Sequence, residues 1–254
     1  MEIDEFVIVA LIPALYFMLI HFLSPKIYQE FKQHKKKIFS LFGGIAAAYV
    51  FVDLLPKLEQ AQDHIRNLFQ GLPNFVYSVA APSMAFLGFM IFFGIEHLAI
   101  SSQEKNEMEN NDSISNRKTF AVHLGNILFI NLIVGYLLRF EAELGTFALA
   151  LYSIILSLHF ITLDESMEDH YSKDYTSFGR YVAGLAPLVG WVLSVFFPEN
   201  QSEGYIILAV VTGAVLFNSI KNEIPSTTES NVKMFFVGAS ITAITLFIVA
   251  WLRG

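Results

Sequence analysis

The sequence predicts an all-α, polytopic membrane protein with about eight transmembrane helices. Apolar residues make up 54% of the 254 residues and charged residues 15%, whereas ordinary soluble domains contain about 25% charged residues. Long apolar runs recur along the chain, and polar connections separate them. Because the runs occupy nearly the entire length, we predict a single transmembrane domain over residues 1–254 that contacts the lipid bilayer.

A helix needs about 20 predominantly apolar residues to cross roughly 30 Å of hydrocarbon. Eight segments approach or exceed this length: 6–22, 38–55, 75–100, 120–138, 146–163, 181–197, 205–220 and 232–252. The first segment has neither a basic leader nor a small-residue cleavage site, so we interpret it as a retained span and not as a signal peptide.

Two connections are longer and more polar than the others. The range 101–119 is rich in Asn, Glu and Ser, which predicts a flexible polar loop. The range 164–180 is acidic and is either a loop or an extension of the fifth helix. In the helical case Asp164 and Glu168 share one face and His170 lies on another, an arrangement that could gather ions at a cytoplasmic exit. A solvated acidic helix end is the alternative.

Lys and Arg predict the orientation, because basic loops remain in the cytoplasm. The first connection contains Lys26, Lys32, Lys35, Lys36 and Lys37, whereas the sixth contains neither Lys nor Arg. We therefore expect a multi-pass protein of the cell (inner) membrane with both termini on the non-cytoplasmic side.

The composition excludes several classes of chemistry. The chain contains no cysteine, so any metal site must use His, Asp, Glu, Asn or backbone oxygen. No basic stripe with interleaved aromatic residues suggests nucleic-acid binding, and we expect no nucleic-acid partner.

An internal repeat links the second and seventh spans. Pro56 follows Gly44 by twelve positions, and Pro225 follows Gly213 by the same number. The two spans run in opposite directions, which predicts an inverted 3+2+3 repeat of the kind that places a transport site near the midplane. Chance recurrence of Gly and Pro in membrane helices is the alternative explanation.

The second span ends in Asp53-Leu-Leu-Pro56, and with the topology this pattern resembles the ZIP family of metal-ion transporters. Family members carry His-Asn-x-x-Asp-Gly in the fourth span and His-Glu-x-Pro-His-Glu in the fifth. The corresponding segments here are Ile-Asn-Leu-Ile-Val-Gly at 130–135 and His-Phe-Ile-Thr-Leu-Asp at 159–164. The first segment retains the asparagine and the glycine, and the second retains its first histidine and an acid at its last position. Apolar residues at the remaining positions argue against a two-metal site, because they cannot replace the hydration shell of an ion.

The resemblance implies a transporter for a divalent cation, Zn²⁺, Fe²⁺ or Mn²⁺, which this ligand chemistry does not distinguish. It also implies a homodimer. We expect no enzymatic activity and one reduced midplane site. The candidate ligands are the retained motif residues, the polar residues of the two repeat spans and the histidine of the acidic segment: His159, Asp164, Asn131, Asp53, Asn222, Glu223 and His170.

Other interpretations stay open. His159 and Asn131 are equally suited to bonding neighbouring helices, and Asp53 to lining an outer vestibule. A non-transporting ZIP-like partner or regulator would have its midplane packed shut by Ile130, Val134, Phe160 and Leu163. A membrane-embedded metal hydrolase would use His159, Asp164 and His170. A polar cavity that reaches His159 favours transport, whereas apolar packing favours the non-transporting protein.

Overall fold

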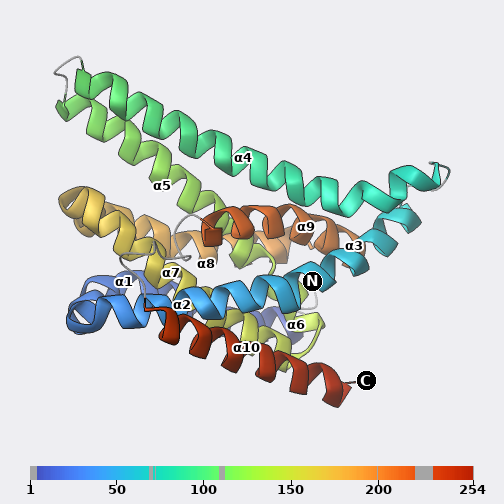
Figure 1. The fold of residues 1–254 in the computed structure, drawn as a ribbon. Helices are drawn as coiled ribbons and strands as arrows, with labels where there is room; N and C mark the ends of the chain where they lie inside the picture. The colour runs from blue at the N-terminus through green and yellow to red at the C-terminus, as the bar shows by residue number, and fades with distance from the viewer. Residues whose placement is uncertain are drawn as a thin grey trace.

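The computed structural model describes residues 5–68, 71, 73–108, 112–198, 200–220 and 231–253, and within these ranges every regular element is a helix (Figure 1). The all-α prediction is confirmed. The α-helices are α1 (Glu5–Phe31), α2 (Lys35–Tyr49), α3 (Leu55–Leu68), α4 (Asn74–Met108), α5 (Asp112–Tyr136), α6 (Leu138–Glu143), α7 (Thr146–Asp174), α8 (Arg180–Phe196), α9 (Gln201–Asn218) and α10 (Val232–Arg253). The short helical turns are η1 (Lys32–His34), η2 (Val50–Leu54) and η3 (Tyr175–Gly179).

Among the described residues, six helical stretches are long and apolar enough to cross a membrane: Glu5–Leu68, Asn74–Leu98, Arg117–Glu143, Thr146–Tyr171, Tyr175–Phe196 and Val232–Trp251. A shorter apolar helix covers Ser202–Phe217. The first stretch contains α1 and α2, between which the chain reverses at η1 (Figure 1). Length and composition therefore indicate a membrane protein with many helices, while the count of eight spans stays a prediction.

The two polar connections differ from simple loops. In the range 101–119, α4 continues to Met108 and α5 begins at Asp112, so most of the predicted loop is helical. This range contains neither Gly nor Pro, and its Glu, Gln, Lys and Met residues favour helix. In the acidic range, α7 continues to Asp174 and η3 leads into α8. The candidate residues 164–170 therefore lie on a helix.

Paired glycines bring three couples of helices into close contact: α2 with α10, α4 with α9, and α5 with α8. At each crossing, a Cβ atom added to a glycine would clash with a backbone carbonyl of the partner helix, and both helices contribute one such glycine. The pairs are Gly44 and Gly238, Gly88 and Gly213, and Gly135 and Gly190. Small residues allow this approach in membranes, where helix association depends on packing.

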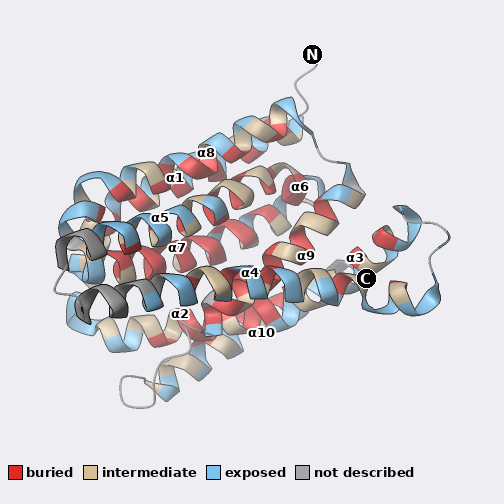
Figure 2. Ribbon diagram, turned by 90° about the horizontal axis from the view of Figure 1, so that it is seen from above, coloured by how far each residue is buried: buried red, intermediate tan, exposed pale blue. Residues whose placement is uncertain are grey.

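Helix α7 is the centre of the structure. Among the six apolar stretches, the one in α7 has the largest buried share. Figure 2 shows buried residues along most of the length of this helix. Helix α1 packs on both α7 and α8. Figure 1 shows α3, α6 and the C-terminus at one end, and the turn between α1 and α2 at the other. Polar side chains of α7 are thereby held in the interior of the bundle.

Gly44→Ala should destabilise the protein by about 1–3 kcal/mol, the usual cost of overpacking, because the new methyl group meets the Phe235 carbonyl of α10. Thermal unfolding in detergent, followed through the fluorescence of Trp191 and Trp251, measures the change. Gly125→Ala is the control, since nothing lies within 4 Å of its added Cβ. Equal unfolding temperatures for the two variants would contradict the close crossing.

Candidate functional site

A buried polar network joins four elements in the interior of the bundle. His21 of α1 and Asp164 of α7 form a close pair, with Nδ1 of His21 2.8 Å from Oδ1 and 3.0 Å from Oδ2 of Asp164. The Asn131 side chain of α5 lies 2.9 Å from Nε2 of His21. Tyr175 of η3 donates its hydroxyl proton to Asp164. His21, Asn131 and Asp164 are each at most 1% exposed.

Hydrogen-bond partners assign the protonation of the pair. Nδ2 of Asn131 donates to the carbonyl oxygen of Ala183 at 3.0 Å, which fixes the orientation of the amide. The same amide nitrogen faces Nε2 of His21, so Nε2 is an acceptor and the ring proton is on Nδ1. His21 is therefore a hydrogen-bond donor through Nδ1, and Asp164 accepts hydrogen bonds from both His21 and Tyr175.

The sequence of α1 explains why His21 faces inward. Its buried residues include Ala10, Ala14, Phe17, His21 and Ser24, spaced three or four apart on one helical face. The small residues of this face allow α1 to approach its neighbours. The Phe160 ring covers the imidazole, with centroids 4.9 Å apart. The pair is thus enclosed by apolar side chains.

One atom of the network has no partner. Oδ1 of Asn131 is buried and accepts no hydrogen bond from the described residues. A buried acceptor without a donor is costly, and buried polar atoms of native proteins are nearly always paired. The nitrogen of the same amide contacts the His21 imidazole, and an amide oxygen without a donor is a group that can coordinate a cation.

The other predicted ligands are placed as follows. His159 is buried on α7 at 3% exposure, next to Phe160. His170 is exposed and bonds only locally, with Nδ1 2.8 Å from the Ser166 carbonyl oxygen. Asp53 lies at the other end of the bundle, against Lys57. Asn222 and Glu223 lie outside the described residues. Among the described side chains, no three His, Asp or Glu residues form a group that could hold a metal ion.

The apolar replacements of the motif are packed in the interior. Ile130, Val134, Phe160 and Leu163 are all buried and belong to one hydrophobic cluster. A cavity of about 460 Å³ near Asp53 reaches Tyr49 and Tyr152, but His159 is not among its lining residues. By the criterion set from the sequence, this packing favours the non-transporting protein, whereas the unpartnered Asn131 oxygen favours an ion site.

An acidic cluster extends α7 past the network, at the end opposite the termini. Lys35 pairs with Glu165 and, at 2.8 Å, with Asp169. Tyr28 donates to Asp169 at 3.1 Å. These contacts tie the turn between α1 and α2 to α7, and they place carboxylates next to water on the side predicted to be cytoplasmic.

Sequence reasoning missed His21, Tyr175, Lys57 and Glu141. A signal existed for His21, because an ionisable residue inside an otherwise apolar run is rare and usually functional. Glu141 came directly after the predicted fourth span and was therefore treated as part of a connection, although α6 buries it completely.

His21→Leu should destabilise the protein by about 3–5 kcal/mol, because it leaves the Asp164 carboxylate buried without its main partner. The double variant with Asp164→Leu should recover most of this loss, since both polar groups are then absent. Denaturant unfolding in detergent measures the free energy of unfolding of each variant in this double-mutant cycle. His170→Leu, at an exposed position, is the control and should change this free energy by nearly zero. Additive losses from the two single variants would contradict a direct pair.

No protein-family model matches the chain, and no curated protein matches it at a significant level. The resemblance to the ZIP family therefore stays a prediction that depends on the partial motifs of the second, fourth and fifth spans.

Proposed function

We propose that the protein is a ZIP-like membrane carrier for a divalent cation, with one reduced site formed by Asp164, Asn131 and His21. The observation that supports it most strongly is the buried, unpartnered Oδ1 of Asn131, whose amide nitrogen contacts His21 of the Asp164–His21 pair. Ionisable residues inside membrane spans are rare and commonly mark ion pathways.

The ligand chemistry agrees with a cation that binds and leaves. Carboxylate oxygen, amide oxygen and imidazole nitrogen all coordinate Zn²⁺, Fe²⁺ and Mn²⁺. At rest, the protons of His21 and Tyr175 satisfy Asp164 in place of a metal. A cation has to compete with these donors, because metal ligands must be free of protons at the coordinating atom. Weak binding is an advantage for transport, which requires release as well as capture.

Polar groups lie on both sides of the pair along α7. On the side of the termini, the cavity near Asp53 is lined by Tyr152 and Ala148 of α7. On the other side, Glu165, Glu168 and Asp169 follow Asp164 on the same helix. The pair thus lies between a cavity at one end and a carboxylate cluster at the other.

The helix contacts support the inverted repeat that such carriers use. In the proposed repeat α1 corresponds to α8, α2 to α9 and α4 to α10. Exchanging the halves then converts the α2–α10 crossing into the α9–α4 crossing, and each crossing has a reciprocal pair of glycines. A π-helical turn begins at Val50, six residues after Gly44, and another begins at Ser219, six residues after Gly213.

A non-transporting membrane partner is the second candidate, and the packing of Ile130, Val134, Phe160 and Leu163 favours it. In that protein the Asp164–His21 pair would only hold helices together.

Uptake of Zn²⁺, Mn²⁺ and Fe²⁺ into liposomes containing the purified protein distinguishes the two. We expect flux of at least one ion. Asp164→Asn and Asn131→Leu should each lower that flux by at least about tenfold, the lower end of what the loss of groups around a metal site causes. Asp174→Asn is the matched control, because it removes an exposed carboxylate from the end of the same helix.

Correctly folded wild-type protein that transports none of the three ions would overturn the carrier and favour the non-transporting partner. Flux that is equal in all three variants would instead show that the path avoids the network.

A further inference from the structure

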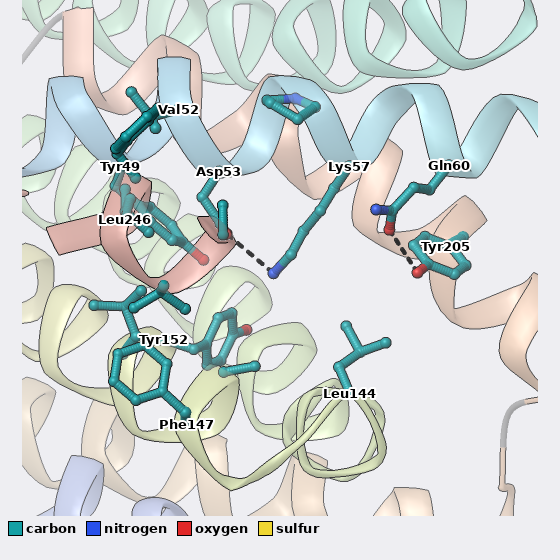
Figure 3. Close-up of a pocket in the computed structure, with 16 residues that line it drawn as sticks. Tyr49, Val52, Asp53, Lys57, Gln60, Leu144, Phe147, Tyr152, Tyr205 and Leu246 are labelled. Carbon is teal, nitrogen blue, oxygen red and sulfur yellow. Dashed lines mark hydrogen bonds and ion pairs between the residues drawn. The ribbon is translucent and has the colours of Figure 1, made fainter. Parts of the chain in front are cut away.

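The cavity of about 460 Å³ at the end of the bundle near the termini has one polar and one apolar wall (Figure 3). Helices α7 and α10 supply most of the apolar wall. The polar wall comes from α2, η2, α3, α7 and α9, and it comprises Tyr49, Asp53, Lys57, Gln60, Tyr152 and Tyr205. Sites for small molecules commonly have volumes of about 300–1,000 Å³ and combine an apolar lining with a few polar groups. The cavity therefore has the size and the lining of a site for an amphiphilic molecule.

The ends of three apolar segments surround this cavity. The apolar stretch of α7 begins at Thr146 and that of α10 ends at Trp251. The predicted second span ends at residue 55, where the polar helix α3 begins. Residues close to all three ends line the cavity. Trp251 is exposed, and tryptophan is enriched at the boundary between a membrane and water. The cavity therefore lies at the level where phospholipid headgroups are expected.

The apolar rim of the cavity is open to the side of the bundle. Val52, Phe147 and Phe247 line the cavity, and these side chains are 39%, 45% and 71% exposed. Exposed apolar side chains on membrane-spanning helices contact acyl chains, which are as apolar as leucine. A lipid can therefore place its headgroup in the cavity while its acyl chains remain in the bilayer beside these three residues.

Opposite charges lie next to each other on the polar wall. Nζ of Lys57 is 3.0 Å from Oδ2 of Asp53, and the Tyr49 hydroxyl also interacts with this carboxylate. A carboxylate has about four lone-pair positions for hydrogen bonds, so these two donors leave positions for a ligand. Lys57 is also 3.0 Å from Oε1 of Glu141, a residue that does not line the cavity. The polar wall thus presents one carboxylate and one ammonium group.

Gln60 adds a hydrogen-bond donor to the same wall. Its Oε1 accepts a hydrogen bond from the Tyr205 hydroxyl at 2.7 Å, and its amide nitrogen points toward the Lys57 side of the cavity (Figure 3). Asp53, Lys57 and Gln60 are spaced four and three positions apart, so one face of the continuous helix presents all three. Ammonium and amide N–H groups donate to phosphate oxygens. Donors for a phosphate therefore lie beside an acceptor for a cation.

We propose that this cavity binds the headgroup of phosphatidylethanolamine, with its ammonium at Asp53 and its phosphate at Lys57 and Gln60. A primary ammonium carries three N–H donors for the carboxylate. The quaternary ammonium of phosphatidylcholine carries no N–H, and phosphatidylglycerol has no cation to meet Asp53. The cavity therefore selects a zwitterionic lipid with a primary amine. Lipid binding requires no ion flux, so this site is independent of the proposed carrier function.

Native mass spectrometry of the purified full-length protein measures which lipid it retains. The protein is equilibrated in detergent micelles that contain equal amounts of phosphatidylethanolamine, phosphatidylcholine and phosphatidylglycerol. We expect one bound phosphatidylethanolamine, with an affinity about tenfold higher than that for either other lipid, which is the effect of one hydrogen bond to a charged group.

Three variants locate the bound lipid. Asp53→Asn should remove the preference for phosphatidylethanolamine, because the neutral amide attracts the ammonium less. Ala148→Trp should abolish its retention, since Ala148 lines the cavity and the larger side chain fills it. Glu59→Gln is the matched control, because it neutralises an exposed carboxylate of α3 that does not line the cavity.

Thermal unfolding separates binding from misfolding, because a ligand of the folded state raises the unfolding temperature. Phosphatidylethanolamine, but not phosphatidylcholine, should raise the unfolding temperature of the wild-type protein and of Glu59→Gln, and should leave that of Ala148→Trp unchanged. Asp53→Asn preserves the volume of the side chain, so it tests the site even when Ala148→Trp does not fold.

Equal retention of the three lipids, preference for phosphatidylglycerol or phosphatidylcholine, or retention of no lipid would overturn the proposal. A preference for phosphatidylethanolamine that survives both Asp53→Asn and Ala148→Trp would also overturn it, because the lipid would then bind elsewhere on the protein.

Discussion

The Asp164 carboxylate is the constraint on which the interior of this protein depends. A charge buried away from water is expensive, and Asp164 is only 1% exposed, at a place where two donors from other elements meet it. His21 fixes α1 against α7, Tyr175 fixes η3 under the same helix, and Asn131 ties α5 to both through its bonds to His21 and to Ala183. Hydrogen bonds around this one charge therefore connect α1, α5, α7 and α8, in addition to the apolar packing between them.

Local patterns in the sequence predicted the helices and their apolar faces, because hydropathy is a property of neighbouring residues. The motif resemblance also selected Asp164 and Asn131, which the structure brings into one network with His21. His21 itself is 143 residues away from Asp164 along the chain, and no local pattern encodes such a pairing. Glu141 was missed because it follows the predicted fourth span and was assigned to a connection, whereas in the structure it pairs with Lys57 of α3. The polar range 101–119 differs from its prediction for another reason. Its polarity predicted a loop, but its residues favour helix and include neither Gly nor Pro, and most of the range is helical.

Three sets of carboxylates along the bundle share one feature, a side-chain donor that comes from another turn or helix. Asp53 and Glu141 hold Lys57, Asp164 holds His21, and Glu165 and Asp169 hold Lys35. Each acidic group thus has a donor from another turn or helix. At rest, side-chain donors occupy carboxylate oxygen atoms that a metal ion would use. Any transported cation must instead replace side-chain partners one site at a time, which keeps binding reversible at every step.

The three partners differ in how readily they can be replaced, and this difference separates a carrier from an inert scaffold. Lys35 and Lys57 have flexible stems and partial exposure, so they can turn toward water when an ion arrives. His21 is completely buried under Phe160 and can move only if α1 shifts against α7. In the proposed carrier, exchange at Asp164 therefore requires a movement of α1, whereas exchange at the two ends requires side-chain rotation only. In the non-transporting partner α1 would stay in place, and the Asp164–His21 pair would only hold α1 and α7 together.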